Sequence, residues 1–338
     1  MKKSHILTAA AAAAALALSA CGGGSGSGDS QSSAATSESA ADGAAYSIGI
    51  TQLLSHPSLD QSREGFMDAL KEAGVNATYD EKNAQGDQST AADIAGSFAS
   101  GNYDLILAIA TPTAQATAQA ISDKPILFTA VTDPVDAGLV KSMDAPGANI
   151  TGTSDANPVK EQLELIKEIN PDAKKIGVPY SPGEANSLVQ VQWAKDAAAG
   201  LGLEIVEGPA TTSADVLQAV ESLKDTDAIY VPTDNIVVAA LETVLQFGET
   251  NKIPVYGAEG DSVERGALAT VGLSYYELGK QTGEMAVKIL KDGADPATMP
   301  VETQKETVLY VNEGAAKRMD VTIPQSVLDK VAPENLVK

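Results

Sequence analysis

The chain has 338 residues, of which 43% are hydrophobic and 20% are charged, and these values are ordinary for a globular protein. Asp and Glu total 45 against 23 Lys and Arg, so the formal net charge is −22. A surface this acidic repels nucleic-acid phosphates and anionic lipid headgroups, which argues against nucleic-acid binding and against a protein that lies flat on a membrane. Beyond the N-terminal leader, no apolar run approaches the roughly 18 residues of a membrane-spanning helix.

Residues 1–20 are predicted to be a secretory signal peptide. Lys2 and Lys3 precede an Ala- and Leu-rich run at 6–17, which is shorter than the roughly 20 residues of a comfortable bilayer span. Residues 18–21 read LSAC and resemble a bacterial lipobox, in which the cysteine is lipidated and the chain is cleaved before it. An ordinary signal peptide with an incidental cysteine is the alternative.

The lipobox implies that acyl chains, palmitate among them, hold the mature protein at the outer face of the cell membrane through Cys21. Cys21 is the single cysteine of the sequence, so no disulfide forms within the chain. Residues 21–45 are rich in Gly, Ser and Ala after the cysteine, without hydrophobic periodicity, and are predicted to be a flexible linker.

From residue 46 onward, short apolar runs alternate with segments of helical spacing. This alternation predicts an α/β fold in which parallel sheets are covered by helices on both faces. The strands are expected at 46–54, 77–80, 105–110, 125–131, 175–180, 203–206, 228–231 and 253–256, and the helices at 57–73, 89–100, 113–121, 184–199, 213–223, 236–247 and 276–290.

The second half of this pattern repeats the first at a constant shift of 128 residues. Gly74 corresponds to Gly202, and Asp133 corresponds to Asp261. Several matches at one shift, together with the same order of elements, predict two similar α/β lobes. Chance similarity between two α/β segments is the alternative.

Polar residues gather after the predicted strands, where open parallel sheets bind their ligands. The same residue types cap helices, so each of them has two explanations. The candidates lie at 51–56, 111–113, 132–134, 180–181, 184–187, 233–235 and 259–261.

The segment Thr111-Pro112-Thr113 joins a buried strand directly to a helix. The helix N-terminus and both hydroxyls could bind a carboxylate. Asp133, Asp234 and Glu259 are then candidates to bind an ammonium, and a ligand with both charges would be an amino acid.

Catalytic patterns are weak in this sequence. Its two histidines are His5, in the leader, and His56, so no Ser-His-Asp or Cys-His arrangement extends beyond one imidazole. No His/Cys cluster has the spacing of a zinc site, and no nucleotide-binding fingerprint follows a strand. A hydrolase that uses only carboxylates stays open, since paired acids need only meet in space.

Several stretches carry a resemblance to a known family. The chain resembles an ABC-transporter substrate-binding lipoprotein with the type I periplasmic-binding-protein fold, and more narrowly the tryptophan/tyrosine transport binding proteins. The stretches are IGITQLLSHPSLDQSREGF (48–66), LILAIATPTAQATAQA (105–120), LFTAVTDPVDAGLV (127–140), ITGTSDANPVKEQLELIK (150–167), YVPTDN (230–235) and YGAEGDSVERGALATVGLSYYELG (256–279).

The resemblance implies two Rossmann-like lobes joined by a three-strand hinge. The N-terminal lobe would comprise 46–153 and about 275–305, and the C-terminal lobe 154–273 and about 306–338. It implies a monomer without enzymatic activity, cofactor or metal, which passes a small solute, most simply an aromatic amino acid, to an ABC permease with its own ATPase. A lipid-anchored sensor for a sugar or nucleoside, or a carboxylate-based surface hydrolase, is the alternative.

The resemblance also assigns roles to residues of the cleft. Thr111 and Thr113 would bind a ligand carboxylate, and Asp133 or Glu259 its ammonium. His56, Tyr180 and Tyr275 would stack on an aromatic ligand. Asp155 and Asn235 would be polar contacts. The remaining residues expected to bind the ligand are Pro112, Asn186, Thr233 and Asp234.

Overall fold

The computed structural model describes residues 45–304 and 306–338 of the chain. The predicted signal peptide, the lipidation site Cys21 and residues 22–44 of the predicted linker lie outside the described residues. Within the described ranges, no helix is both long enough and apolar enough to cross a membrane.

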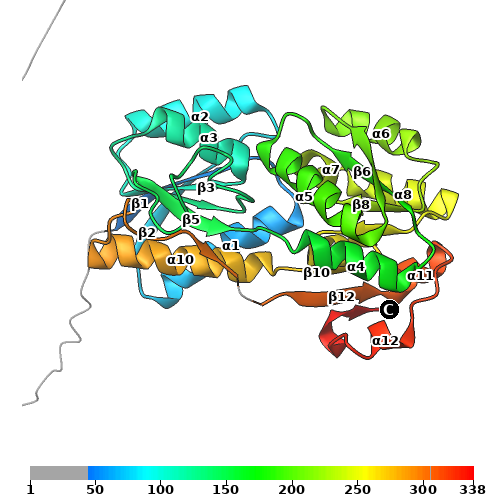
Figure 1. Ribbon diagram of the computed structural model, residues 1–338. Helices are drawn as coiled ribbons and strands as arrows, with labels where there is room; N and C mark the ends of the chain where they lie inside the picture. The colour runs from blue at the N-terminus through cyan, green and yellow to red at the C-terminus, as the bar shows by residue number, and fades with distance from the viewer. Residues whose placement is uncertain (1–44, 305) are drawn as a thin grey trace, which may run out of the picture. The chain divides into compact units, whose positions relative to one another are not determined.

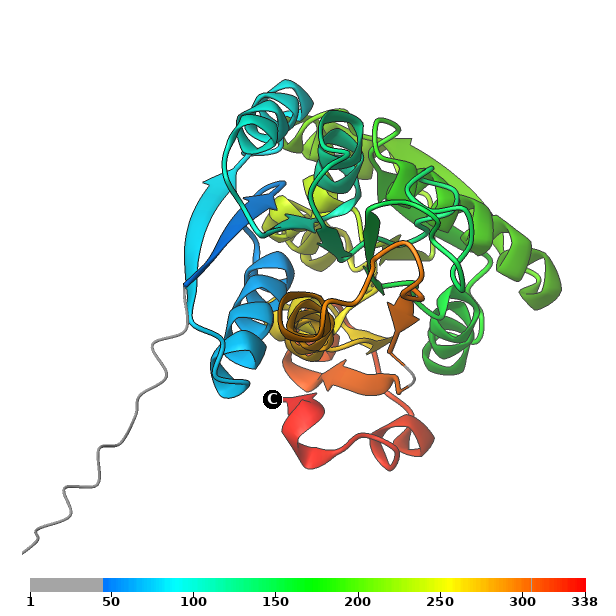
Figure 2. The same cartoon turned by 90° about the vertical axis from the view of Figure 1, so that its left-hand side faces the viewer.

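A six-stranded parallel sheet, in the order β11-β5-β4-β3-β1-β2, forms the first part of the fold. Helices α2 and α3 cover one face of this sheet, and α1 and α10 cover the other (Figure 1). Figure 2 views α10 nearly end-on, with α1 beside it. The elements are β1 (Tyr46–Gln52), α1 (Pro57–Glu72), β2 (Ala77–Asn83), α2 (Gln88–Ser100), β3 (Leu105–Ile109), α3 (Thr111–Ala120), β4 (Ile126–Thr129), β5 (Ile150–Ser154), α10 (Tyr275–Asp292) and β11 (Glu302–Thr303).

Strand β3 shows why the sheet needs helices on both faces. All of its residues are buried. Leu107 and Ile109 pack in one core cluster with Phe66 of α1, whereas Ile106 and Ala108 pack in another cluster with Phe98 of α2. Alternate residues of a strand point to opposite faces, so an unbroken apolar run fits a parallel strand that is covered on both sides. This part of the sequence prediction is confirmed.

Two further sheets contain the second half of the chain. A four-stranded parallel sheet has the order β7-β6-β8-β9, and a three-stranded sheet has the order β10-β12-β13. The elements are α4 (Val159–Ile169), β6 (Lys175–Tyr180), α5 (Ala185–Leu201), β7 (Glu204–Pro209), η1 (Ser213–Asp215), α6 (Val216–Ser222), β8 (Ala228–Val231), α7 (Asn235–Ala239), α8 (Leu241–Asn251), β9 (Val255–Gly257), α9 (Gly260–Arg265), β10 (Ala269–Gly272), β12 (Val308–Asn312), α11 (Glu313–Arg318), α12 (Gln325–Leu328), η2 (Pro333–Asn335) and β13 (Leu336–Val337).

The pair β10–β12 is antiparallel, which departs from the purely parallel sheets that the sequence pattern predicts. The chain leaves β10 toward α10, which packs on the six-stranded sheet, and it returns to β12 from β11 of that same sheet. One strand therefore leads away from the three-stranded sheet at the end where the other enters it, so the two strands run in opposite directions.

We call the six-stranded sheet with α1, α2, α3 and α10 the N-terminal lobe, and the other two sheets with their helices the C-terminal lobe. The chain passes between the lobes three times, from β5 to α4, from β10 to α10, and from β11 to β12. The lobe boundaries given in the sequence analysis stay a prediction.

Some helices differ from their expected limits. The segment predicted as one helix at 213–223 begins as the 3₁₀ turn η1, where Thr212 and Asp215 form a reciprocal capping box, before α6 starts. The helix predicted at 236–247 divides into α7 and α8 because the backbone of Ala240 leaves helical geometry, with φ −108° and ψ 24°. Helices α4 and α9 were not among the predicted elements.

The backbone at Gly74 and Gly202 agrees with the shift of 128 residues. Each glycine follows a long helix, α1 or α5, and each has φ +65°. Only glycine adopts this left-handed conformation without steric penalty, so it commonly ends helices. The two lobes therefore end their corresponding first helices in the same way.

Candidate functional site

A pocket lies among residues that follow strands of both lobes, and it contains about 300 Å³ of space not filled by atoms, its opening included. The pocket is lined by His56, Ser58, Leu59, Ala130, Asp155, Asn186, Thr233, Asp234, Asn235, Val238, Glu259 and Tyr275.

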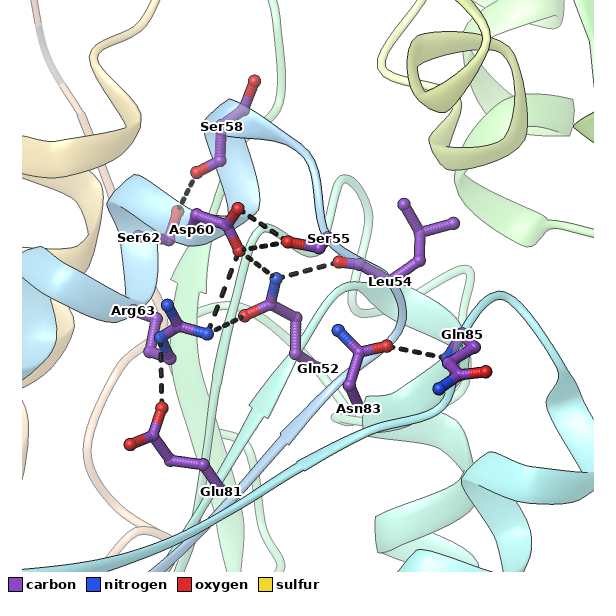
Figure 3. Close-up of polar contacts among 10 residues, drawn as sticks. All are labelled: Gln52, Leu54, Ser55, Ser58, Asp60, Ser62, Arg63, Glu81, Asn83 and Gln85. Atoms are coloured by element: carbon purple, nitrogen blue, oxygen red, sulfur yellow. Dashed lines mark hydrogen bonds and ion pairs between the residues drawn. The ribbon is translucent and has the colours of Figure 1, made fainter.

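The connection from β1 to α1 is held by a polar network (Figure 3). The amide of Gln52 donates to Asp60 at 2.7 Å, and the hydroxyl of Ser55 donates to the same carboxylate at 2.8 Å. Arg63 donates to the side-chain oxygen of Gln52 at 3.3 Å. These bonds fix the loop, so the residues at its end, His56 and Ser58, enter the pocket.

His56 occupies the N-cap position of α1 without capping the helix through its side chain. It is 8% exposed, and neither ring nitrogen has a hydrogen-bond partner among the described residues. Burial lowers the pKa of His56 to about 4, although the neighbouring Asn235 opposes this shift. The imidazole is therefore neutral at physiological pH, with one donor and one acceptor to offer a ligand.

Two alanines at strand ends have unusual backbone conformations. Ala130, which follows β4 and lines the pocket, has φ +56°, and Ala110, which follows β3, has φ +82°. Non-glycine residues in this region cost about 1–3 kcal/mol each, and they cluster at binding sites. Both of these conformations lie at the carboxyl edge of the six-stranded sheet.

Asp155 and Tyr275 lie where the chain passes between the lobes. The hydroxyls of Tyr275 and Thr132 donate to Asp155 at 2.5 and 2.9 Å. Burial raises the pKa of Asp155 above its usual value, and these two hydrogen bonds offset part of that rise.

Glu184 and Asp234 form a buried acidic pair in the C-terminal lobe. Asp234 caps α7 by accepting from the backbone N–H of Val237 at 2.8 Å, and it also accepts from the Ser187 hydroxyl at 2.6 Å. Glu184 accepts from the side-chain amide of Asn235 at 2.6 Å. Burial, and then the nearby Asp234 carboxylate, raise the pKa of Glu184 to about 8; burial also raises the pKa of Asp234.

Glu259 links the two lobes. Its carboxylate accepts from the Ser58 hydroxyl of α1 at 2.6 Å and also from the Ser262 hydroxyl. Burial, and then the charge of Asp261, raise the pKa of Glu259 to about 7.

Two further hydrogen bonds join the lobes. The side-chain amide of Gln61 donates to Asp261 at 2.6 Å, and that of Gln88 donates to the carbonyl of Gly183 at 3.0 Å.

The charge around the pocket has one sign. Asp155, Asp234 and Glu259 line it, and no lysine or arginine is among the described residues that do so. Thr233 and Asn186 each carry a buried side-chain oxygen that has no partner within residues 45–304 and 306–338. The residues of the described part of the chain form no cluster that could hold a metal ion. The pocket therefore suits a ligand that brings hydrogen-bond donors and a positive charge.

The structure brings together eight of the site residues predicted from the sequence. These residues are His56, Asp155, Asn186, Thr233, Asp234, Asn235, Glu259 and Tyr275. Thr111 is not part of the lining; it is buried at the first position of α3, and its hydroxyl has no partner among the described residues.

The other predicted residues lie outside the pocket lining. The Thr113 hydroxyl donates to backbone carbonyls of residues 109 and 110, and Pro112 lies in a separate surface groove between α2 and α3. Asp133 accepts from the backbone N–H groups of Val135 and Asp136 and so caps its own turn. The Tyr180 hydroxyl donates to Glu207 at 2.9 Å. Their predicted ligand roles stay predictions.

Sequence reasoning did not assign Ser58, Leu59, Ala130 and Val238 to the site. Ser58 and Leu59 belong to the first turn of a predicted helix that begins after His56. Their closeness to His56 in the sequence was the feature that could have indicated a place in the site. Ala130 and Val238 are apolar, and nothing in their residue type separates pocket lining from core.

A model of the family described as ABC transporter substrate binding protein matches residues 47–334. This chain belongs to that family. The predicted resemblance and fold class are thereby confirmed, since the matched range covers both lobes.

Known relatives include other substrate-binding proteins. A protein of Clostridioides difficile (strain R20291) named Tyrosine-binding protein is 45% identical over 280 residues, which are 81% of either chain. A structure from Streptococcus pneumonia, described as an ABC domain in complex with L-Trp, is 37% identical with a TM-score of 0.83, covering 87% of this chain and 100% of its own.

A third relative was solved without ligand. The ligand-free, open structure of a substrate binding protein from Clostridium difficile is 47% identical and covers 86% of this chain and 98% of its own, with a TM-score of 0.65. The present structure therefore superposes better on the L-Trp complex, with a TM-score of 0.83 against 0.65, although the L-Trp complex is less similar in sequence.

Proposed function

We propose that this substrate-binding protein captures a free aromatic amino acid, tyrosine or tryptophan, in the pocket between its lobes and delivers it to an ABC permease. The observation that carries the proposal is the group of buried carboxyls, Asp155, Asp234 and Glu259, around a pocket without a lining lysine or arginine. A buried acid that is ionised needs a partner of opposite charge, and the ammonium of an amino acid is such a partner.

The choice of an aromatic side chain rests on the relatives and on the lining. A relative at 45% identity carries the name Tyrosine-binding protein, and another at 37% identity was solved with L-Trp. In this chain, Leu59 and Val238 provide apolar surface, and the rings of His56 and Tyr275 provide aromatic surface in the same pocket. A flat apolar side chain with one polar atom suits this combination.

We propose the eight predicted residues of the lining as ligand contacts, with Thr111 as a further donor toward the ligand carboxylate. Ligand held between the lobes would touch both only when they are close, so binding favours the closed arrangement. The three passages of the chain between the lobes would then act as the hinge. The predicted lobe limits, 46–153 with about 275–305 and 154–273 with about 306–338, place the ends of both lobes at these passages.

We also propose that the mature protein is extracytoplasmic and is held at the membrane by acyl chains on Cys21, as the lipobox-like LSAC sequence indicates. Radiolabelled palmitate should appear in the wild-type protein and be absent from Cys21→Ser. The variant should also leave the membrane fraction. A Cys21→Ser protein that still sediments with membranes and carries label would refute the anchor.

Calorimetry tests the ligand. L-tyrosine, L-tryptophan and L-phenylalanine should bind, and at least one should bind at micromolar concentration or below. Glucose, uridine and tyramine, which lacks the carboxylate, should bind much more weakly. The recovered amino acid should be chemically unchanged. Binding of a sugar or nucleoside in place of every aromatic amino acid would overturn the proposal.

A further inference from the structure

Glu184 stands behind the pocket and holds two of the residues that line it. It is 3% exposed and lies at the N-cap position of α5. One oxygen of its carboxylate, Oε2, accepts from the side-chain Nδ2 of Asn186 at 3.0 Å and of Asn235 at 2.6 Å. Both asparagines line the pocket, whereas Glu184 does not.

These two hydrogen bonds set the direction of both amides. Oε2 is the acceptor in both bonds, with or without a proton on the other carboxyl oxygen, so each asparagine turns its NH₂ group toward Glu184. The NH₂ group of Asn186 also donates to the carbonyl of Thr233 at 3.0 Å. Each amide oxygen therefore points away from Glu184.

Two oxygens of this wall are acceptors without a donor among the described residues. Oδ1 of Asn186 and the hydroxyl of Thr233 are buried and have no hydrogen-bond partner among the described residues. Asn235 lines the same pocket, and its amide oxygen likewise faces away from Glu184. One wall of the pocket thus presents oxygen atoms that lack donors.

Helix capping does not account for Glu184. Its side chain makes no capping hydrogen bond to α5, in contrast to Asp234, which caps α7. A residue that served only its helix would accept from that helix's free N–H groups. The carboxylate of Glu184 instead reaches across to α7.

A primary ammonium matches this wall. It brings three N–H donors to oxygens that have none, and a positive charge to a region that contains the carboxylates of Glu184 and Asp234. A hydroxyl would bring one donor and no charge.

We propose that Glu184 is a positioning residue for the ligand's primary ammonium, because it holds Asn186 and Asn235 with their oxygens toward that group. The inference rests on the proposed function, and it names the part of the pocket that distinguishes an amino acid from its deaminated analogue.

The test compares two ligands that differ only in the ammonium, L-tyrosine and 3-(4-hydroxyphenyl)propionate, by calorimetry; L-tryptophan and indole-3-propionate serve in the same way if tryptophan binds more tightly. In Glu184→Met, which keeps the side-chain length and removes the acceptor, the preference for the amino acid should fall by about tenfold or more, as expected for lost hydrogen bonds to a charged group. Affinity for the deaminated analogue should change little.

Two variants complete the design. Glu184→Gln retains an oxygen that can accept from both asparagines, so it should restore part of the lost preference. Glu207→Met is the matched control, since Glu207 lies on β7 of the same lobe and bonds to Tyr180 and Lys195; its preference should equal that of the wild type. If Glu184→Met shows no cooperative thermal transition, Asn186→Leu makes the same test.

The outcomes separate the inference from the proposed function. A preference that stays within about threefold of the wild type in Glu184→Met, with tyrosine still bound, overturns the positioning role and leaves the proposed function intact. Equal loss for both ligands also overturns it, because that result indicates general damage to the pocket. If the wild type binds no amino acid, the proposed function and the inference fail together.

Discussion

The hydroxyl of Tyr275 donates to the carboxylate of Asp155 at 2.5 Å, and both side chains line the pocket. Asp155 directly follows β5, where the chain first leaves the N-terminal lobe, and Tyr275 is the first residue of α10, where the chain returns to it. The bond therefore joins two of the three passages between the lobes, and it does so at the pocket.

Tyr275→Phe should weaken binding of the aromatic amino acid by about tenfold, because a hydrogen bond to a buried acid contributes about 1.5–3 kcal/mol. Calorimetry measures the change. Tyr276→Phe is the matched control, since the neighbouring hydroxyl bonds to Asp68, outside the pocket lining. Equal affinities for the two variants would contradict the role of the Tyr275–Asp155 pair.

Ser58→Ala should shorten the lifetime of the ligand complex. The substitution removes the donor to Glu259 that joins α1 to the C-terminal lobe, and contacts made only in the closed form act mainly on the dissociation rate. Stopped-flow fluorescence should show a rate about tenfold faster than that of the wild type. Ser62→Ala, one turn further along α1, removes hydroxyl bonds to backbone carbonyls within the N-terminal lobe and should leave this rate unchanged.

The stability of the ligand-free protein should fall between pH 6.5 and pH 8. Glu259 and Glu184 have pKa values raised to about 7 and about 8. A carboxyl with a raised pKa binds its proton more tightly in the folded state, so stability decreases as the pH rises toward that pKa. His56, whose pKa is lowered from 6.5 to about 4, has the opposite effect, but only below pH 6.5.

Differential scanning fluorimetry measures this dependence as a melting temperature. Glu184→Gln, which cannot ionise, should reduce the decline between pH 6.5 and pH 8, and saturating ligand should do the same because its ammonium stabilises the ionised acids. A melting temperature that rises across this range in the ligand-free protein would show that these carboxyls are not desolvated.

Thr111→Val and Thr113→Val separate two neighbouring candidates for the ligand carboxylate. The Thr111 hydroxyl is buried without a partner among the described residues, whereas the Thr113 hydroxyl already bonds to the backbone of residues 109 and 110. Thr111→Val should reduce affinity by about fivefold, and Thr113→Val should leave it nearly unchanged. If calorimetry finds no loss for either variant, the carboxylate lies elsewhere.

The fold follows from the sequence because its strongest signals are local. An apolar run such as residues 105–109 fits only a strand that is buried on both faces, and glycines at 74 and 202 mark helix ends. The antiparallel pair β10–β12 gave no such signal. Its direction depends on the route of the chain between the lobes, which no local pattern encodes.

The site was predictable to the extent that strand ends define it. Asn186, Asn235 and Glu259 follow strands and line the pocket. Asp133 has the same residue type and the same position after a strand, yet it bonds to its own turn. Glu184 is the opposite case, because a residue outside the lining is important there. Its proposed role depends on its hydrogen bonds to Asn235, about 50 residues away in sequence, and on the orientation that they give to the Asn235 amide.

In the hydrogen bonds described above between the lobes, the N-terminal lobe supplies every donor and the C-terminal lobe every acceptor. Ser58, Gln61 and Gln88 of the N-terminal lobe donate, and Glu259, Asp261 and Gly183 of the C-terminal lobe accept. If the lobes descend from a duplicated ancestor, as the shift of 128 residues suggests, their facing surfaces must have diverged into unlike halves.

Asp133 and Asp261, which correspond at that shift, show this divergence at one position, since the first caps a turn and the second accepts from the opposite lobe. A chimera built from this protein and a relative would therefore need both halves of each such pair from the same parent.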